Sequence, residues 1–114
     1  MNGSERSDLW ARVRSGDHSA IDELVELAVD DGDLDELRLL SDLGNANATD
    51  ELIQLAGEEG NLAELRRLSD LGNGTATDEL IEAAVEQGNL EELRRLADDG
   101  NVTAAEVLAE LIDD

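Results

Sequence analysis

The segment "GNLAELRRLSDLGN" at residues 60–73 decides the fold, because it returns almost unchanged further along the chain. Residues 88–101 read "GNLEELRRLADDGN", and residues 32–45 read "GDLDELRLLSDLGN". The spacing between successive copies is constant, and such a repeat indicates an array of stacked supersecondary units. Two columns of glycine share the period: Gly32, Gly60, Gly88 and Gly16, Gly44, Gly72, Gly100.

Each unit predicts two helices with one apolar face apiece. In the first helix, apolar residues recur at offsets of three and four, which places them on one side. These columns are Leu24/Leu52/Leu80/Leu108, Val25/Ile53/Ile81, Leu27/Leu55/Ala83/Leu111 and Ala28/Ala56/Ala84/Ile112. In the second helix, the apolar columns are Leu34/Leu62/Leu90, Leu37/Leu65/Leu93 and Leu40/Leu68/Leu96.

The residues between these patterns predict where each helix begins and ends. For the first helix we expect N-caps at the polar column Ser19, Asn47, Thr75, Thr103. We expect its end at Gly32, Gly60 or Gly88, since glycine readily adopts the left-handed C′ conformation. The next residue (Asp33, Asn61 or Asn89) caps the second helix, with a glutamate three places on. So short a turn requires the two helices to pack antiparallel.

The sequence therefore predicts an all-α fold, an α-solenoid of antiparallel helix hairpins with about eight helices. We expect one domain, residues 1–114, with repeats at 19–46, 47–74 and 75–102. Half-repeats at 5–15 and 103–114 form the terminal caps. Trp10 is the only aromatic residue and aligns with Arg38. It either covers the end of the core or serves as a binding aromatic.

Two resemblances to known families follow from these residues. The pattern in "GDHSAIDEL", "GNANATDEL", "GNGTATDEL" and "GNVTAAEVL" is similar to the inter-unit junction of Sel-like tetratricopeptide repeats. The stretch "AAVEQGNLEELRRLADDGN" resembles the helical half of ankyrin repeats. The period is shorter than the ~34 and ~33 residues of those families, and no room is left for the ankyrin β-hairpin finger. Both resemblances imply a protein-binding scaffold and neither implies catalysis.

The charge is strongly acidic. Thirty Asp and Glu face eight basic residues, all of them Arg, for a formal charge of −22. Such a field repels nucleic acid and anionic membranes and attracts basic partners. The alternative is an adaptation for solubility. No apolar run reaches the ~18 residues of a membrane span, and no signal-peptide pattern opens the chain, so we expect a cytoplasmic protein.

Residues with catalytic or metal-binding chemistry are scarce. Cysteine is absent and His18, which we expect in an interhelical loop, is the only histidine. We therefore predict no enzyme activity, no cofactor and no metal. The predicted function is a scaffold that binds a protein or peptide on its groove or acidic face, as a monomer, and the acidic charge favours a basic partner. Two alternatives stay open: a structural or designed array without a ligand, and an acidic decoy for a basic nucleic-acid-binding protein.

Two sets of outward charges are candidates for partner binding. The second helices carry Arg38, Arg66, Arg67, Arg94 and Arg95. These form either a solvated ridge with Glu64–Arg67 and Glu91–Arg95 pairs, or a clamp for an acidic peptide. The first helices carry Glu58, Glu59 and Glu86 in the last turn, where the helix dipole disfavours negative charge. Since helix stability does not explain these acids, they suit a docking surface for a basic partner or a solubility device.

Overall fold

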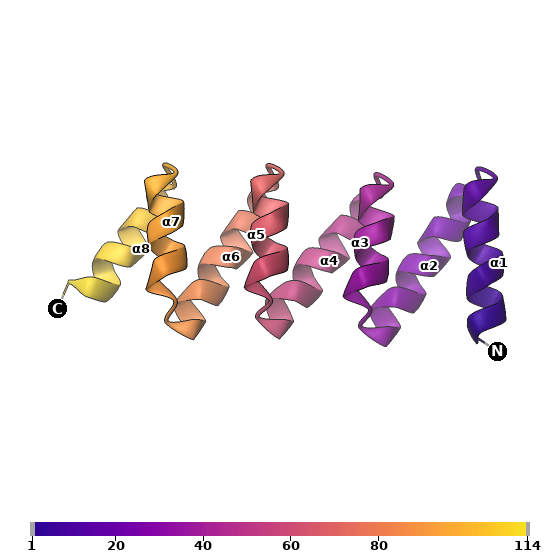
Figure 1. Ribbon diagram of the computed structural model, residues 1–114, viewed down its shortest axis with the longest axis horizontal. Coiled ribbons are helices and arrows are strands. Elements are labelled where there is room, and N and C mark those ends of the chain that lie inside the picture. The colour runs from indigo at the N-terminus through magenta and orange to yellow at the C-terminus, as the bar shows by residue number, and fades with distance from the viewer. Residues whose placement is uncertain (1, 114) are drawn as a thin grey trace. The chain divides into compact units, whose positions relative to one another are not determined.

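The computed structural model describes residues 2–113, with side chains from residue 5 onward, and this part of the chain is entirely helical (Figure 1). It contains eight helices and no strand. They are α1 (Asn2–Arg14), α2 (His18–Asp31), α3 (Leu34–Asp42), α4 (Ala46–Glu59), α5 (Leu62–Asp70), α6 (Gly74–Gln87), α7 (Leu90–Asp98) and α8 (Val102–Ile112). The predicted all-α class, an α-solenoid type of repeat built from antiparallel hairpins, is confirmed.

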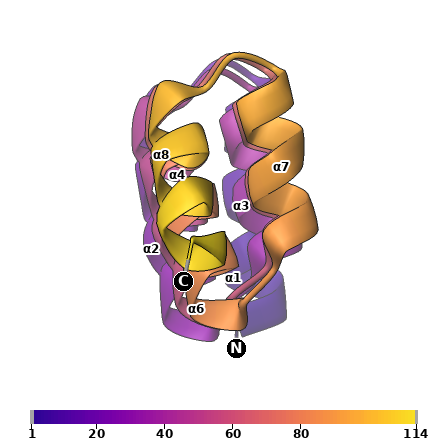
Figure 2. The same ribbon diagram turned by 90° about the vertical axis from the view of Figure 1, so that its left-hand side faces the viewer.

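The chain divides into two compact units, Met1–Leu55 and Ala56–Asp114, with the division inside α4. Within each unit, successive helices run in opposite directions (Figure 1). In the first unit, α1 and α3 lie on one side and α2 on the other (Figure 2). In the second unit, α7 lies opposite α6 and α8 (Figure 2). Odd-numbered helices are the second helices of the repeat, and even-numbered ones are the first helices.

The turn after each first helix follows the prediction. Gly32 has φ 64°, the left-handed conformation that favours glycine, and the N–H of Asp33 donates to the carbonyl of Ala28 at 2.9 Å. Asp33 then caps α3 by accepting a hydrogen bond from the N–H of Glu36 at 3.1 Å. The equivalent caps are formed by Asn61 to Glu64 and Asn89 to Glu92.

The predicted caps of the first helices were wrong by two positions. The N-cap is the residue directly after the other glycine column: Asp17, Asn45, Asn73 and Asn101. An Asn side chain there accepts the N–H of an alanine three places on, as Asn73 does from Ala76 at 2.9 Å. Ser19 and its equivalents therefore lie inside the helix, and His18 is the exposed first residue of α2 rather than a loop residue.

The core consists of small and medium aliphatic side chains, most of them in the predicted columns. The buried alanine column that begins at Ala20 was not predicted, and in the predicted columns Leu111 and Ile112 are exposed while Leu27, Leu55 and Leu108 are half-buried. Alanine is fully buried at its two columns within the units, where helix backbones approach closely: Ala20, Ala28, Ala48, Ala56, Ala76, Ala84, Ala104. The leucines at 24, 37, 40, 52, 65, 80 and 93 are also fully buried. Leu34, Leu62 and Leu90 are only half-buried, contrary to expectation, because they lie in the first turn beside the cap.

Helix α7 packs more closely on α8, the first helix that follows it, than on α6, the first helix that precedes it. The most extensive contacts are between α1 and α2, α5 and α6, and α7 and α8. Hydroxyl pairs reinforce this contact, with Ser41 bonded to Thr49 and Ser69 bonded to Thr77. The threonine hydroxyl also donates to the carbonyl of the cap residue, Asn73 in the second unit, at 3.2 Å. Serine is therefore the donor and threonine the acceptor of each pair.

We predict that Thr77→Ala costs about 1 kcal/mol of stability and that Ser69→Ala costs less. Thr77→Ala leaves the half-buried Ser69 hydroxyl without its acceptor, whereas Ser69→Ala leaves Thr77 still donating to Asn73. The double variant should be close to neutral, because Ala97 and Ala105 occupy these columns in the last repeat. Urea unfolding followed by circular dichroism measures the cycle. Additive single effects would contradict the pairing.

Candidate functional site

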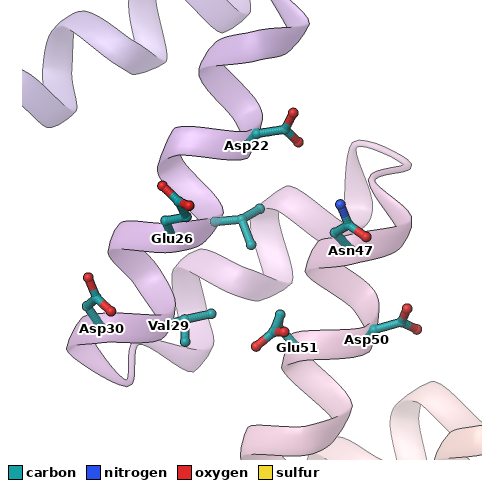
Figure 3. A pocket seen from close by; sticks show the side chains of 8 residues that line it. Asp22, Glu26, Val29, Asp30, Asn47, Asp50 and Glu51 are labelled. Carbon is teal, nitrogen blue, oxygen red and sulfur yellow. The ribbon is translucent and has the colours of Figure 1, made fainter.

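An acidic groove lies between α2 and α4 of the first unit (Figure 3). Its volume is about 600 Å³. Five carboxylates and one amide surround two valines, and the lining residues are Asp22, Val25, Glu26, Val29, Asp30, Asn47, Asp50 and Glu51. Val29 and Glu51 face one another across the groove (Figure 3). The groove thus combines an apolar floor with a rim of negative charge.

Helical spacing on α2 produces this combination. Val25 and Val29 are four positions apart, so they lie on the same face, one turn above the other. Asp22, Glu26 and Asp30 repeat the same spacing beside them and form a parallel row of acids. Val25 is buried against the core, whereas Val29 remains 39% exposed and is open to a ligand.

The second unit contains the same groove between α6 and α8. Its volume is about 460 Å³, and its lining residues are Asp78, Ile81, Glu82, Val85, Glu86, Thr103 and Val107. Each lies two repeat periods after its counterpart in the first groove, for example Val85 after Val29. Val107 takes the place of Glu51, so the second groove has fewer carboxylates and a larger apolar floor.

The predicted acidic residues relate to these grooves in different ways. Glu86 lines the second groove directly. Glu58 occupies the same repeat column as Asp30 and Glu86 and is exposed on α4. Glu59 is exposed at the last residue of α4 and belongs to the neighbouring column. No arginine lines either groove, so the carboxylates there have no basic neighbour within the lining.

Three of the five predicted arginines (Arg66, Arg67 and Arg95) are engaged with buried glutamates. Glu92, 4% exposed, receives one guanidinium on each carboxylate oxygen. Arg66 donates through Nε to Oε1 at 2.9 Å, and Arg95 donates through Nε to Oε2 at 2.9 Å. Arg66 belongs to the preceding second helix, α5, and Arg95 to the same helix as Glu92. One carboxylate therefore joins two second helices.

The other buried glutamates have comparable partners. Glu64, 3% exposed, accepts from Arg67 Nε at 3.0 Å. Glu36, 7% exposed, accepts from Trp10 Nε1 at 3.0 Å and pairs with Arg6 at 2.9 Å. Trp10 thus takes the place of the repeat arginine in its column and bonds to the next second helix. We call this set of contacts the arginine–glutamate ladder.

The ladder corrects one predicted pair and confirms another. The predicted Glu64–Arg67 pair is present. The predicted Glu91–Arg95 pair is wrong, because Arg95 instead pairs with Glu92 on the same helix. Arg95 also lies 3.4 Å from Asp99 and 3.8 Å from Asp70. Arg38 is half-buried and also has a partner. Only Arg94 among the five is exposed. The sequence contains a signal for the pairing between successive second helices, because Arg66 precedes Glu92 by the same number of residues as Trp10 precedes Glu36.

Ladder geometry affects the ionisation of Glu92. Burial by itself raises the pKa of this carboxyl, but the hydrogen bonds from Arg66 and Arg95 and their positive charges outweigh it. The pKa of Glu92 therefore lies below its ordinary value. The hydrogen bond to Glu92 correspondingly raises the pKa of Arg66, against desolvation. Glu92 also lies in the first turn of α7, where the helix dipole favours its negative charge.

Comparisons with known proteins identify no relative: no family model, no curated protein and no solved structure matches this chain. Among the described residues, no group of three or more His, Cys, Asp or Glu is arranged to hold a metal ion. None of the helices between residues 2 and 113 is long and apolar enough to cross a membrane.

We predict that Glu92→Gln destabilises the fold by about 1–2 kcal/mol at pH 7. Hydrogen bonds to charged groups contribute more than this when buried, but both arginines remain over one-third exposed, and solvent screens them. Because the folded pKa is lowered, the contribution exists above the unfolded value of about 4.3 and is lost as pH falls through the folded pKa. Urea unfolding at pH 7 and below pH 4 should show the variant's deficit shrinking with acidity.

Glu91→Gln is the matched control, since Glu91 is the exposed neighbour of Glu92 on the same turn. It should change stability by less than about 0.5 kcal/mol at either pH. A Glu92→Gln deficit that is equally large at both pH values would contradict the role of the ionised carboxylate.

Proposed function

We propose that this chain is a non-enzymatic helical-repeat scaffold that binds a basic segment of a partner protein in its acidic grooves. We further propose a repeat of the tetratricopeptide type and a cytoplasmic location. The observation that carries the proposal is the recurrence of one groove, with an apolar floor and a carboxylate rim, in both units.

The charge distribution favours a basic ligand over an acidic one. Of the arginines that could have clamped an acidic peptide, Arg66 and Arg95 are held by Glu92 and Arg67 is held by Glu64. Only Arg94 among them is exposed. The groove carboxylates face solvent and have no arginine among the lining residues. A positive segment therefore gains attraction there without breaking an existing ion pair.

The groove floor indicates what accompanies the positive charge. Val29 and Val85 are 39% and 37% exposed, an apolar surface placed between rows of acids. Lysine and arginine have long aliphatic stems that cover such surface while their charged heads reach carboxylates. Volumes of about 600 and 460 Å³ hold several side chains. A segment with alternating Arg or Lys and aliphatic residues fits both features.

We predict that a fluorescent dodecapeptide of alternating Arg and Leu binds at low salt, measured by anisotropy. Neutralising the groove acids by Glu26→Gln, Asp30→Asn, Glu82→Gln and Glu86→Gln together should weaken binding roughly tenfold, taking about 0.2–1 kcal/mol for each exposed pair. Val29→Ser with Val85→Ser should weaken it at high salt too, because apolar contact is not screened.

A matched control changes the same number and kinds of exposed acids outside the grooves: Glu5→Gln, Glu91→Gln, Glu110→Gln and Asp98→Asn. Equal weakening by this control would mean that total charge alone attracts the peptide, which contradicts groove binding. Absence of binding at any salt concentration supports a purely structural array. Displacement of DNA from a basic DNA-binding protein would instead support the decoy alternative.

A further inference from the structure

Helix α8 has an apolar face that none of the described residues covers. Leu111 and Ile112 of α8 are 46% and 55% exposed. In the same repeat columns of the second unit, Ala83 is 3% exposed and Ala84 is fully buried. Ala83 and Ala84 belong to α6, which the next second helix, α7, contacts, whereas no helix follows α8 among the described residues. The face of α8 is therefore equivalent to the face of α6 that packs on α7, but no described helix packs on it.

The arginine–glutamate ladder is also incomplete at this end. In the second unit, Arg66 of α5 reaches Glu92 of α7, the next second helix. Arg94 occupies the following position in the arginine column, and no described residue stands at the same offset from it. Arg94 is exposed and makes no ion pair with any described residue. By analogy with Arg66, the partner expected for Arg94 is a carboxylate on a further second helix.

Helix α1 has the features of that further helix. It follows the repeat pattern of a second helix, with Leu9 in the column of Leu37. Asp8 occupies the glutamate column, one repeat period before Glu36, and is exposed without an ion pair to any described residue. Charges also match: α1 carries three Arg against Glu5 and Asp8, the only net positive helix, whereas α8 carries Glu106 and Glu110.

We propose that copies of this chain associate head to tail, with α1 of one copy continuing the array after α8 of another. Arg94 then pairs with Asp8 of the second copy, and Leu111 and Ile112 become covered. A symmetric contact between two α8 helices would instead bring Glu106 and Glu110 against their own copies. The head-to-tail contact joins two different surfaces and is therefore heterologous, so it generates rings or open series of oligomers rather than a symmetric dimer. This proposal is independent of ligand binding in the grooves.

The formal charge of −22 opposes this contact at long range. Lowering the Debye length from ~30 Å in 0.01 M salt to ~3 Å in 1 M salt removes most of the repulsion but leaves the apolar contact intact. The monomer expected from the sequence is therefore the low-salt form, and association increases with salt and protein concentration.

Sedimentation velocity at these two salt concentrations tests the proposal. We expect a 12.2 kDa species at low salt and a concentration-dependent series of dimers, trimers and larger oligomers at high salt. Ile112→Glu should weaken association at least tenfold, whereas Leu71→Glu, the same kind of change at a residue 72% exposed between α5 and α6, should not. A monomer at millimolar concentration in 1 M salt, a series that stops at the dimer, or equal effects of the two substitutions would overturn the proposal.

A charge exchange tests the pairing of unlike ends. Asp8→Arg and Arg94→Glu should each weaken self-association roughly two- to fivefold near 0.15 M salt, since an exposed pair contributes little. Mixing the two variants should restore it, because each chain then offers the end that the other lacks. Failure of the mixture to recover, with both variants helical by circular dichroism, would overturn the head-to-tail arrangement.

Discussion

The buried glutamate in the first turn of α3, α5 and α7 (Glu36, Glu64 and Glu92) is the interaction on which the repeat depends. Its backbone N–H donates to the cap residue, and its carboxylate lies where the helix dipole favours negative charge. An isolated carboxylate in so buried a position would be strongly destabilising, so it requires cationic or strongly polar donors. Arg66 and Arg95 meet that requirement for Glu92, and Arg6 and Trp10 meet it for Glu36. Satisfying one carboxylate therefore fixes the register between successive second helices.

This constraint separates the charges of the protein into two groups. Four of the eight arginines, Arg6, Arg66, Arg67 and Arg95, are held by the buried glutamates of the ladder and stabilise the fold. The acids of the first helices that line the grooves have no arginine among the lining residues and give this surface its negative field. Valines between those acids, Val29 and Val85, leave an apolar strip where first helices of the same unit lie next to each other. The grooves thus consist of the side chains of the first helices that packing between the helices leaves exposed.

Much of the fold could be predicted from the sequence because the repeat multiplies each local signal. Glycine at 32, 60 and 88 ends one helix, and the next residue begins another, as observed. The caps at Asp17 and Asn73 were missed because Ser19 and Thr75 have equally good capping chemistry, and only the backbone path distinguishes them. Glu86 was recognised as an unexplained acid, but the valine floor was not, because Val25 and Val29 also fit a core pattern.

Interactions between repeats are harder to predict, because the two residues that interact belong to different copies of the repeated sequence. The residue types at the two hydrogen-bonded positions still change together from repeat to repeat. Both residues carry a hydroxyl in the pairs Ser41–Thr49 and Ser69–Thr77, and both are alanine in the last pair, Ala97 and Ala105. At the first repeat the same positions are Val13 and Ile21, an apolar pair. Because the two positions of each pair change together, the contact between the two helices explains these residue types better than either helix does alone. A residue such as Arg66 or Ser69 is satisfied only because the neighbouring helix supplies its complement. Arg94 and Asp8 have no ion-pair partner among the described residues, and the proposed head-to-tail contact gives each of them one.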